Sequence, residues 1–165
     1  MEQTEHKLKE AENDYFHKFP LIDNELKLIY IGKDNVSEPD NHLFAYRFIM
    51  SNIESQEEMG GINIKAGYTE NIINYRGNIG FAVNNNFRGP RYSSRSCILL
   101  IPIIKYLGLN PIWITCNIDN YASRKNIEFI KAKYLETVTI PDDSLYATYY
   151  PEKARQKLRF RWDID

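Results

Sequence analysis

The sequence predicts a mixed α/β (α+β) fold, and three observations carry this prediction. Short segments of the N-terminal half alternate between apolar and polar residues, which is typical of strands. The segment 91–107 has serines in its first turn, continues with apolar residues and stops at Gly108, which is typical of a helix. Strand-like segments at 77–83 and 111–116 flank that helix, which predicts one parallel crossover within the sheet.

Size and composition fit one domain over residues 1–165. Hydrophobic residues make up 43% of the 165 positions and charged residues 26%, as in ordinary globular proteins. The net charge of −1 favours no nucleic-acid or membrane partner. We interpret Cys97 and Cys116, both in apolar runs, as buried thiols of a cytoplasmic protein without a leader peptide. His6, His17 and His42 lie outside the segments with functional motifs, so we expect no metal site.

The N-terminal half begins with a predicted helix and continues with strands. Residues 5–19 place apolar side chains near helical spacing before Pro20. The turn-rich segment 32–41 is too short for two helices. The predicted strands are Leu26–Ile31, Leu43–Met50, Gly60–Lys65 and Gly77–Val83.

The C-terminal half begins with a loop over 84–90 and a helix over 91–107, which Pro102 should kink because proline removes a backbone donor. A short strand, Pro111–Cys116, and a second helix, Asn120–Lys131, come next. The chain then closes with a predicted antiparallel pair, Tyr134–Ile140 and Lys157–Trp162, joined through a loop over 141–151.

The stretch from Ile79 to Ser94 runs from strand through a glycine-containing loop into a helix. Such a helix start presents free N–H groups and the positive end of the helix dipole, which bind phosphate or pyrophosphate. Arg88 and Arg91 would add cationic donors beside it. The residues alone leave an alternative open, in which this is a capped helix with two surface arginines.

A second polar stretch follows the strand 111–116. Asn117, Asn120 and Ser123 could offer amide and hydroxyl groups to a cleft at the ends of two neighbouring parallel strands. Each of these residues, taken alone, is equally typical of a turn or a helix cap. The two polar stretches together predict a cleft that binds an anion.

The segments GNIGFAV, FRGPRYSS, ITCNIDNYAS and LRFRW, in this order, resemble the GNAT superfamily of acetyltransferases. They are similar in particular to bacterial predicted N-acetyltransferases with G-H-I-G-Y, R-G-x-x-Y-A and I-T-C-N-x-D-N-x-A-S motifs. The resemblance covers about residues 26–162. It implies a mostly antiparallel central sheet with one splayed parallel strand pair and flanking helices.

The resemblance implies acetyl-CoA as co-substrate and transfer of its acetyl group to an amine by direct attack. The backbone near Val83 would polarise the thioester carbonyl, and a small-molecule or peptide amine would accept the acetyl group. The implied coenzyme-binding residues are Phe81, Ala82 and Val83 for the pantetheine arm, Arg88, Gly89, Pro90, Arg91, Tyr92, Ser93 and Ser94 for the pyrophosphate, and Asn117, Asn120 and Ser123 on the far side.

Several positions depart from the family pattern. Arg91 and Ser93 stand where small loop residues belong, and Ile127 stands where a tyrosine commonly protonates the leaving thiolate. Isoleucine cannot donate a proton. These departures favour an alternative, a catalytically weak or inactive domain that binds or senses acyl-CoA.

The remaining catalytic candidates are weaker. Glu70 and Tyr75 precede the central strand and could face the acceptor, while Ser123, Tyr121, Tyr92 or solvent could protonate the thiolate. We expect an open acceptor side, closed by the N-terminal helix or by a second subunit of a homodimer. The basic segment 153–161 could contact nucleic acid, but the near-zero net charge weighs against it.

Overall fold

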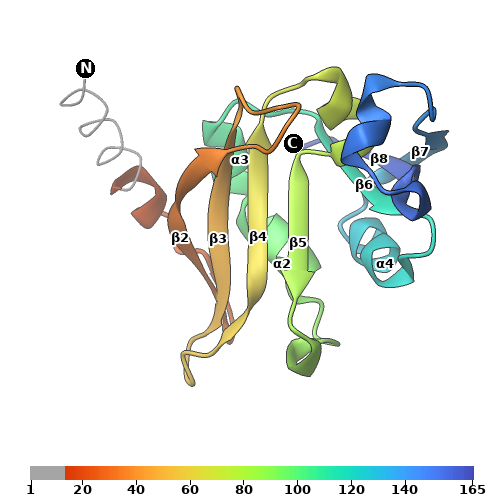
Figure 1. Cartoon of the computed structure of the whole chain (residues 1–165). Helices are drawn as coiled ribbons and strands as arrows, with labels where there is room; N and C mark the ends of the chain where they lie inside the picture. Colours follow the sequence, from red (N-terminus) through yellow and green to blue (C-terminus); the bar gives the residue numbers. More distant parts are fainter. Residues whose placement is uncertain (1–13) are drawn as a thin grey trace, which may run out of the picture.

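The computed structural model describes residues 14–165. Figure 1 shows two groups of strands with helices between and beside them. The strands are β1 (Ile22–Asp23), β2 (Leu26–Asn35), β3 (Phe44–Asn52), β4 (Glu58–Ala66), β5 (Ile79–Val83), β6 (Ile112–Asn117), β7 (Lys133–Thr139) and β8 (Gln156–Trp162). The α-helices are α2 (Tyr92–Leu99), α3 (Ile101–Tyr106) and α4 (Tyr121–Phe129). A π-helix covers Ile72–Arg76, and short 3-10 turns cover Asn85–Phe87, Leu145–Tyr149 and Glu152–Ala154.

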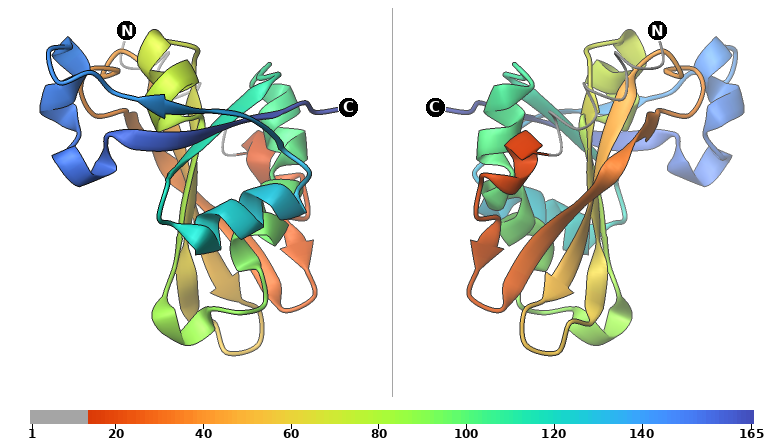
Figure 2. Two further views of the ribbon diagram at one scale, coloured as in Figure 1. Left: turned by 90° about the vertical axis from the view of Figure 1, so that its right-hand side faces the viewer. Right: turned by 90° about the vertical axis from the view of Figure 1, so that its left-hand side faces the viewer.

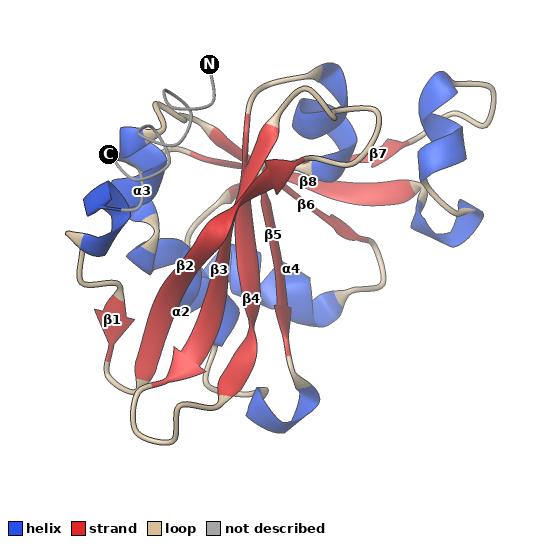
Figure 3. Cartoon of the chain, turned by 60° about the vertical axis from the view of Figure 1, so that its left-hand side comes forward, coloured by secondary structure: helices blue, strands red, loops and turns tan. Residues whose placement is uncertain are grey.

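The first sheet contains β1 to β5 in sequence order, and every neighbouring pair is antiparallel. Apolar side chains from alternate positions, such as Leu28, Phe48 and Ile64, are buried on one face. α2 and α3 cover that face and lie behind the sheet in Figure 1. The other face of β2 to β5 carries no helix of the described chain, as Figure 3 also shows. The predicted sheet class is therefore confirmed.

The second sheet has the order β6-β8-β7, with both pairs antiparallel. This confirms the closing strand pair predicted from the sequence. The arginines of β8 are paired locally, because Arg159 contacts Glu136 at 2.6 Å and Arg161 contacts Asp163 at 2.8 Å. The basic segment therefore presents less free charge than its sequence suggests.

The two sheets meet where β5 and β6 begin. Asn78 donates its N–H to the Trp113 carbonyl at 2.6 Å, and the Trp113 N–H donates to Asn78 Oδ1 at 2.9 Å. A Cβ on Gly77, which has φ +73°, would lie 3.0 Å from backbone atoms of Trp113 and Thr115, so glycine permits this close approach. Beyond this point β5 and β6 belong to different sheets, so the predicted splayed pair is present (Figure 2).

Three local predictions need correction or completion. β2 does not end at Ile31 but continues through an irregularity in its pairing with β3 to Asn35, because that pairing supplies hydrogen bonds to a turn-rich sequence. The helix expected over 91–107 is two helices broken at Leu100, with Pro102 in the first turn of α3. The loop expected over 141–151 contains a 3-10 turn.

The N-terminal region agrees with expectation as far as it is described. Residues 14–17 are helical, and the earlier part of the helix predicted over 5–19 lies outside the described residues. Between β2 and β3 the described chain contains no helix, which confirms the expectation for residues 32–41. No helix in the described part is long and apolar enough to span a bilayer.

Candidate functional site

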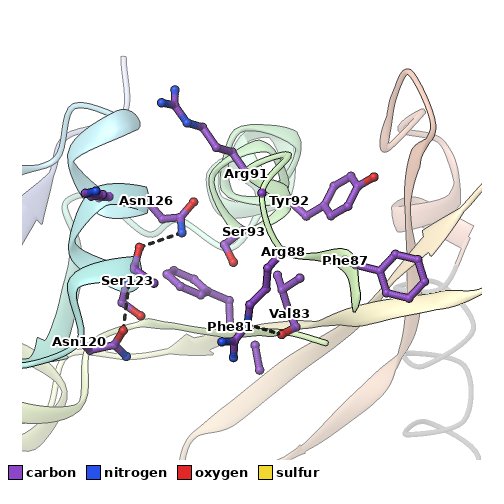
Figure 4. A pocket seen from close by; sticks show the side chains of 14 residues that line it. Phe81, Val83, Phe87, Arg88, Arg91, Tyr92, Ser93, Asn120, Ser123 and Asn126 are labelled. Carbon is purple, nitrogen blue, oxygen red and sulfur yellow. Dashed lines mark hydrogen bonds between the residues drawn. The ribbon is translucent and has the colours of Figure 1, made fainter. Parts of the chain in front are cut away.

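A cavity of about 490 Å³ lies between the end of β5, the following loop, and the first turns of α2 and α4 (Figure 4). Among residues 14–165, its wall contains the cations Arg88, Arg91 and Lys125 and no carboxylate, so it is suited to an anion. The lining residues are Phe81, Ala82, Val83, Phe87, Arg88, Gly89, Arg91, Tyr92, Ser93, Asn120, Ala122, Ser123, Lys125 and Asn126.

The edge of β5 that faces β6 is open beside the cavity. The Asn84 N–H donates to the Met59 carbonyl of β4 at 2.8 Å. Because peptide groups alternate sides along a strand, those of Phe81 and Val83 point away from β4 and into the gap. Ala82 takes the intervening position, and its N–H and C=O face β4. Of the three predicted backbone contacts, only Phe81 and Val83 therefore present free peptide groups to the gap.

The start of α2 supplies further donors. Within the described chain, the N–H groups of Tyr92, Ser93 and Ser94 have no hydrogen-bond acceptor, as expected for the first turn of a helix. Arg91 precedes them in the left-handed conformation, with φ 59° and ψ 38°. Arg91 stands where the family pattern has a small loop residue, and its backbone adopts a conformation that glycine adopts more easily than other residues.

The two loop arginines lie differently. Arg88 Nε lies 3.5 Å from the Val83 carbonyl oxygen, so this guanidinium is beside the open edge of β5. Arg91 stacks over the Phe129 ring at 4.3 Å and points away from the cavity in Figure 4. Arg88 is therefore the nearer cationic donor, and Arg91 contributes at the rim.

The first turns of α4 form the opposite wall. Asn120 caps the helix, with its Oδ1 accepting the Ser123 N–H at 3.1 Å. The Ser94 hydroxyl of α2 lies 2.7 Å from Asn126 Oδ1 and 3.0 Å from the Asn126 carbonyl oxygen. This contact ties the two helices together behind the cavity.

Three predicted coenzyme-binding residues do not line the cavity. They are Pro90, Ser94, whose hydroxyl is held by α4, and Asn117, whose Oδ1 accepts from Lys157 at 2.6 Å. Sequence reasoning missed Phe87, Ala122, Lys125 and Asn126. Helical spacing from Ser123 would have indicated Asn126, which lies three residues further along α4.

Glu70 and Tyr75 lie outside this cavity and come together with the C-terminal loop. Glu70 Oε2 accepts from the Tyr146 hydroxyl at 3.3 Å, and the Tyr75 ring packs edge-on against Tyr146 at 5.5 Å. The Thr115 hydroxyl of β6 donates to the Tyr75 carbonyl at 2.8 Å. Thr115 alternates with the core residues of β6, which places this cluster on the face of that strand opposite the core.

The candidate proton donors for a thiolate differ in position. Ile127 is 1% exposed and belongs to the core. The Tyr92 hydroxyl is occupied, since it donates to Glu25 at 2.8 Å, and Tyr121 is 69% exposed and outside the cavity lining. Ser123 lines the cavity, and its hydroxyl has no hydrogen-bond partner among residues 14–165.

Neither cysteine lines the cavity. Burial raises the pKa of Cys97 to about 12 and that of Cys116 to about 11, so both thiols stay protonated near neutral pH. Among residues 14–165, no three His, Cys, Asp or Glu side chains are grouped as metal ligands.

No family model matches the sequence, and no curated protein matches it. Solved structures do. An acetyltransferase from Salmonella typhimurium that modifies the N-terminal serine of ribosomal protein L7/L12 matches 73% of this chain, with 19% identity and a TM-score of 0.56. A GNAT-family acetyltransferase from Bacillus anthracis matches 71%, with 17% identity and a TM-score of 0.54.

The microcin C7 self-immunity acetyltransferase MccE, solved with acetyl-CoA and AMP, matches 73% of this chain at 16% identity and a TM-score of 0.53. The matches cover 64%, 65% and 61% of these three proteins, so the chain spans less than two thirds of their length. The chain therefore has the mixed α+β fold of the GNAT acetyltransferases, with an antiparallel sheet and flanking helices.

Proposed function

We propose that this protein is an N-acetyltransferase that moves an acetyl group from acetyl-CoA to an amine. One observation carries the proposal: the free amides at the start of α2 and the open edge of β5 face the same cavity, which has no carboxylate in its wall. Coenzyme A carries a diphosphate and a chain with two amide groups. Helix N-termini bind phosphate groups, and open strand edges form hydrogen bonds with amide groups.

Each part of the cavity has a defined task in this proposal. The amides of Tyr92 and Ser93, with Arg88, hold the diphosphate. The peptide groups of Phe81 and Val83 pair with the pantetheine arm, and a free N–H there polarises the thioester carbonyl in the attack. The Ser123 hydroxyl, on the opposite wall, would donate a proton to the leaving thiolate.

The acceptor amine approaches from the other face of the sheets. The short connection between β2 and β3 leaves that face open, which suits a small-molecule amine or a peptide amine. Glu70 and Tyr75, which both contact Tyr146, would form the wall on the β6 side of this approach. The carboxylate there would attract a protonated amine.

The second candidate function is an acyl-CoA-binding or sensing domain with little turnover. The burial of Ile127 favours it, because the position that commonly holds a proton-donating tyrosine is part of the core here. Solvent or Ser123 would have to protonate the thiolate instead. The two candidates share the coenzyme site and differ only in acceptor-dependent turnover.

Two measurements on the full chain separate the candidates. Calorimetry with coenzyme A tests the cavity, and free-thiol release from acetyl-CoA tests turnover over a panel of spermidine, Nα-acetyl-lysine amide and a seryl peptide with a free N-terminus. Amine-dependent thiol release with an acetylated product of matching mass supports the enzyme. Coenzyme binding without such release supports the sensor, and absence of coenzyme binding contradicts both.

A further inference from the structure

Lys65 of β4 lies directly over β5, on the sheet face that none of the helices α2 to α4 in residues 14–165 covers. Its Nζ donates to Asn63 Oδ1 at 3.0 Å. A Cβ added to Gly80 of β5 would lie 3.3 Å from this Nζ and 3.1 Å from Asn63 Nδ2. The missing side chain of Gly80 therefore makes room for the lysine head group, which rests on the neighbouring strand.

This position lies across the sheet from the proposed coenzyme cavity. Gly80 immediately precedes Phe81, whose peptide groups point into the gap between β5 and β6. The start of that gap is fixed by the contact of Asn78 with Trp113. A thioester bound along this edge would have the coenzyme on the helix side and Lys65 Nζ on the acceptor side.

The ammonium of Lys65 has no carboxylate partner among the described residues. Asp40, the carboxylate whose charge acts on Lys65, already accepts hydrogen bonds from Thr69, Asn71 and Arg76. A half-buried charged group without an ion-pair partner costs stability, and such groups concentrate at functional sites.

The surroundings of Lys65 favour its neutral form. Burial, together with the positive charges of Arg76 and Arg47, lowers its pKa to about 8, and Asp40 acts in the opposite direction. A substantial fraction of Lys65 is therefore a neutral amine at pH 8, able to accept a proton.

We propose that Lys65 is the general base that deprotonates the acceptor amine; this inference rests on the proposed acetyltransferase function. The neutral Lys65 amine takes one proton from the acceptor ammonium. The freed nitrogen attacks the thioester carbon, the new N–C bond forms, and the C–S bond breaks. The second proton leaves the nitrogen and ends on the coenzyme thiolate, and Lys65 returns its proton to solvent. Asn63 is the positioning residue that holds Nζ over Gly80.

The test compares Lys65→Met and Lys65→Arg with the control Lys27→Met, an exposed lysine of β2 in the same sheet. In wild type, kcat/KM for the panel amine that is acetylated fastest should rise with pH through about 8. Both Lys65 variants should lose about 100-fold or more, the usual contribution of a general base, and lose this pH dependence. Coenzyme A affinity should stay within about twofold, and the control should match wild type.

A wild-type pH profile in Lys65→Met contradicts the proposal while leaving the acetyltransferase function intact. So does a mass increase of one acetyl group on Lys65 after incubation with acetyl-CoA alone, because the lysine would then be an acceptor. Independently of turnover, NMR titration of ¹³C-labelled lysine should place the Lys65 pKa near 8, and a value above 10 contradicts the proposal. If the wild-type protein does not bind coenzyme A, that result would instead contradict the proposed function itself.

Discussion

The Ser94 hydroxyl of α2 lies 2.7 Å from Asn126 Oδ1 of α4, and this contact sets the spacing of the two helices whose first turns enclose the cavity. Ser94 is 1% exposed. Its hydroxyl therefore joins the two helices behind the cavity, while its backbone N–H remains free at the start of α2.

Ser94→Ala should destabilise the fold and weaken coenzyme binding together. The substitution removes one buried hydrogen bond and leaves the Asn126 oxygens without this donor, which costs about 1–2 kcal/mol. Urea unfolding measures the first effect and calorimetry with coenzyme A the second. Ser37→Ala, an exposed serine, is the matched control. Unchanged stability would show that the two helices are held by apolar packing alone.

Arg91→Gly should separate backbone strain from charge. Glycine relieves the left-handed conformation, worth about 1 kcal/mol, but removes the stacking on Phe129, worth about 0.5–1 kcal/mol, so stability should change little. Loss of the rim cation should weaken coenzyme A binding about fivefold and reduce its salt dependence. Arg124→Met, which removes an exposed arginine of α4, is the control. Unaltered affinity would place Arg91 outside the phosphate contacts.

Asp40 should be the most sensitive position on the acceptor side. It is 1% exposed and receives hydrogen bonds from Thr69, Asn71 and Arg76 at 2.6, 2.8 and 2.9 Å. Asp40→Ala leaves the Arg76 charge buried without its partner and should cost about 3–5 kcal/mol. Asp40→Asn keeps one side-chain oxygen as a hydrogen-bond acceptor and should destabilise the fold less than Asp40→Ala. Thermal and urea unfolding of both variants measure the difference, and equal losses would mean that charge alone matters.

Acid should weaken the attachment of α2 to the first sheet. Hydrogen bonds from Arg95 hold the pKa of Glu25 at about 2, below its ordinary 4.5. The stability that this carboxylate contributes is complete above pH 4.5 and is lost as the pH falls toward 2. Urea unfolding between pH 7 and 2.5 should show a shallower decline for Glu25→Gln than for wild type or the exposed control Glu54→Gln. Parallel declines in all three proteins would contradict this assignment.

The native protein should not react with a thiol reagent at pH 8. Burial raises the pKa of Cys97 to about 12 and that of Cys116 to about 11, so the reactive thiolate is scarce, and both side chains are buried. Ellman's reagent should detect two thiols only after unfolding in guanidinium. Rapid reaction of the native protein would contradict the buried positions.

Local sequence predicted most strands, because alternation of apolar and polar residues depends on neighbours along the chain. It did not predict the end of β2, since residues after Ile31 look like a turn and become a strand only through pairing with β3. The sequence predicted that the backbone of residues 81–83 borders the cleft. It did not predict that the peptide groups of Phe81 and Val83 face the gap while those of Ala82 face β4. That alternation is set by the register between β4 and β5.

The sequence by itself determined the order of strands and helices and the loop that leads into α2. These follow from residue type and spacing. Only the tertiary structure decided that Glu70 meets Tyr146, 76 positions apart, and that Lys65 lies over Gly80. Such pairs depend on strand register and on how two sheets meet at Asn78 and Trp113, and long-range packing rather than local preference fixes both.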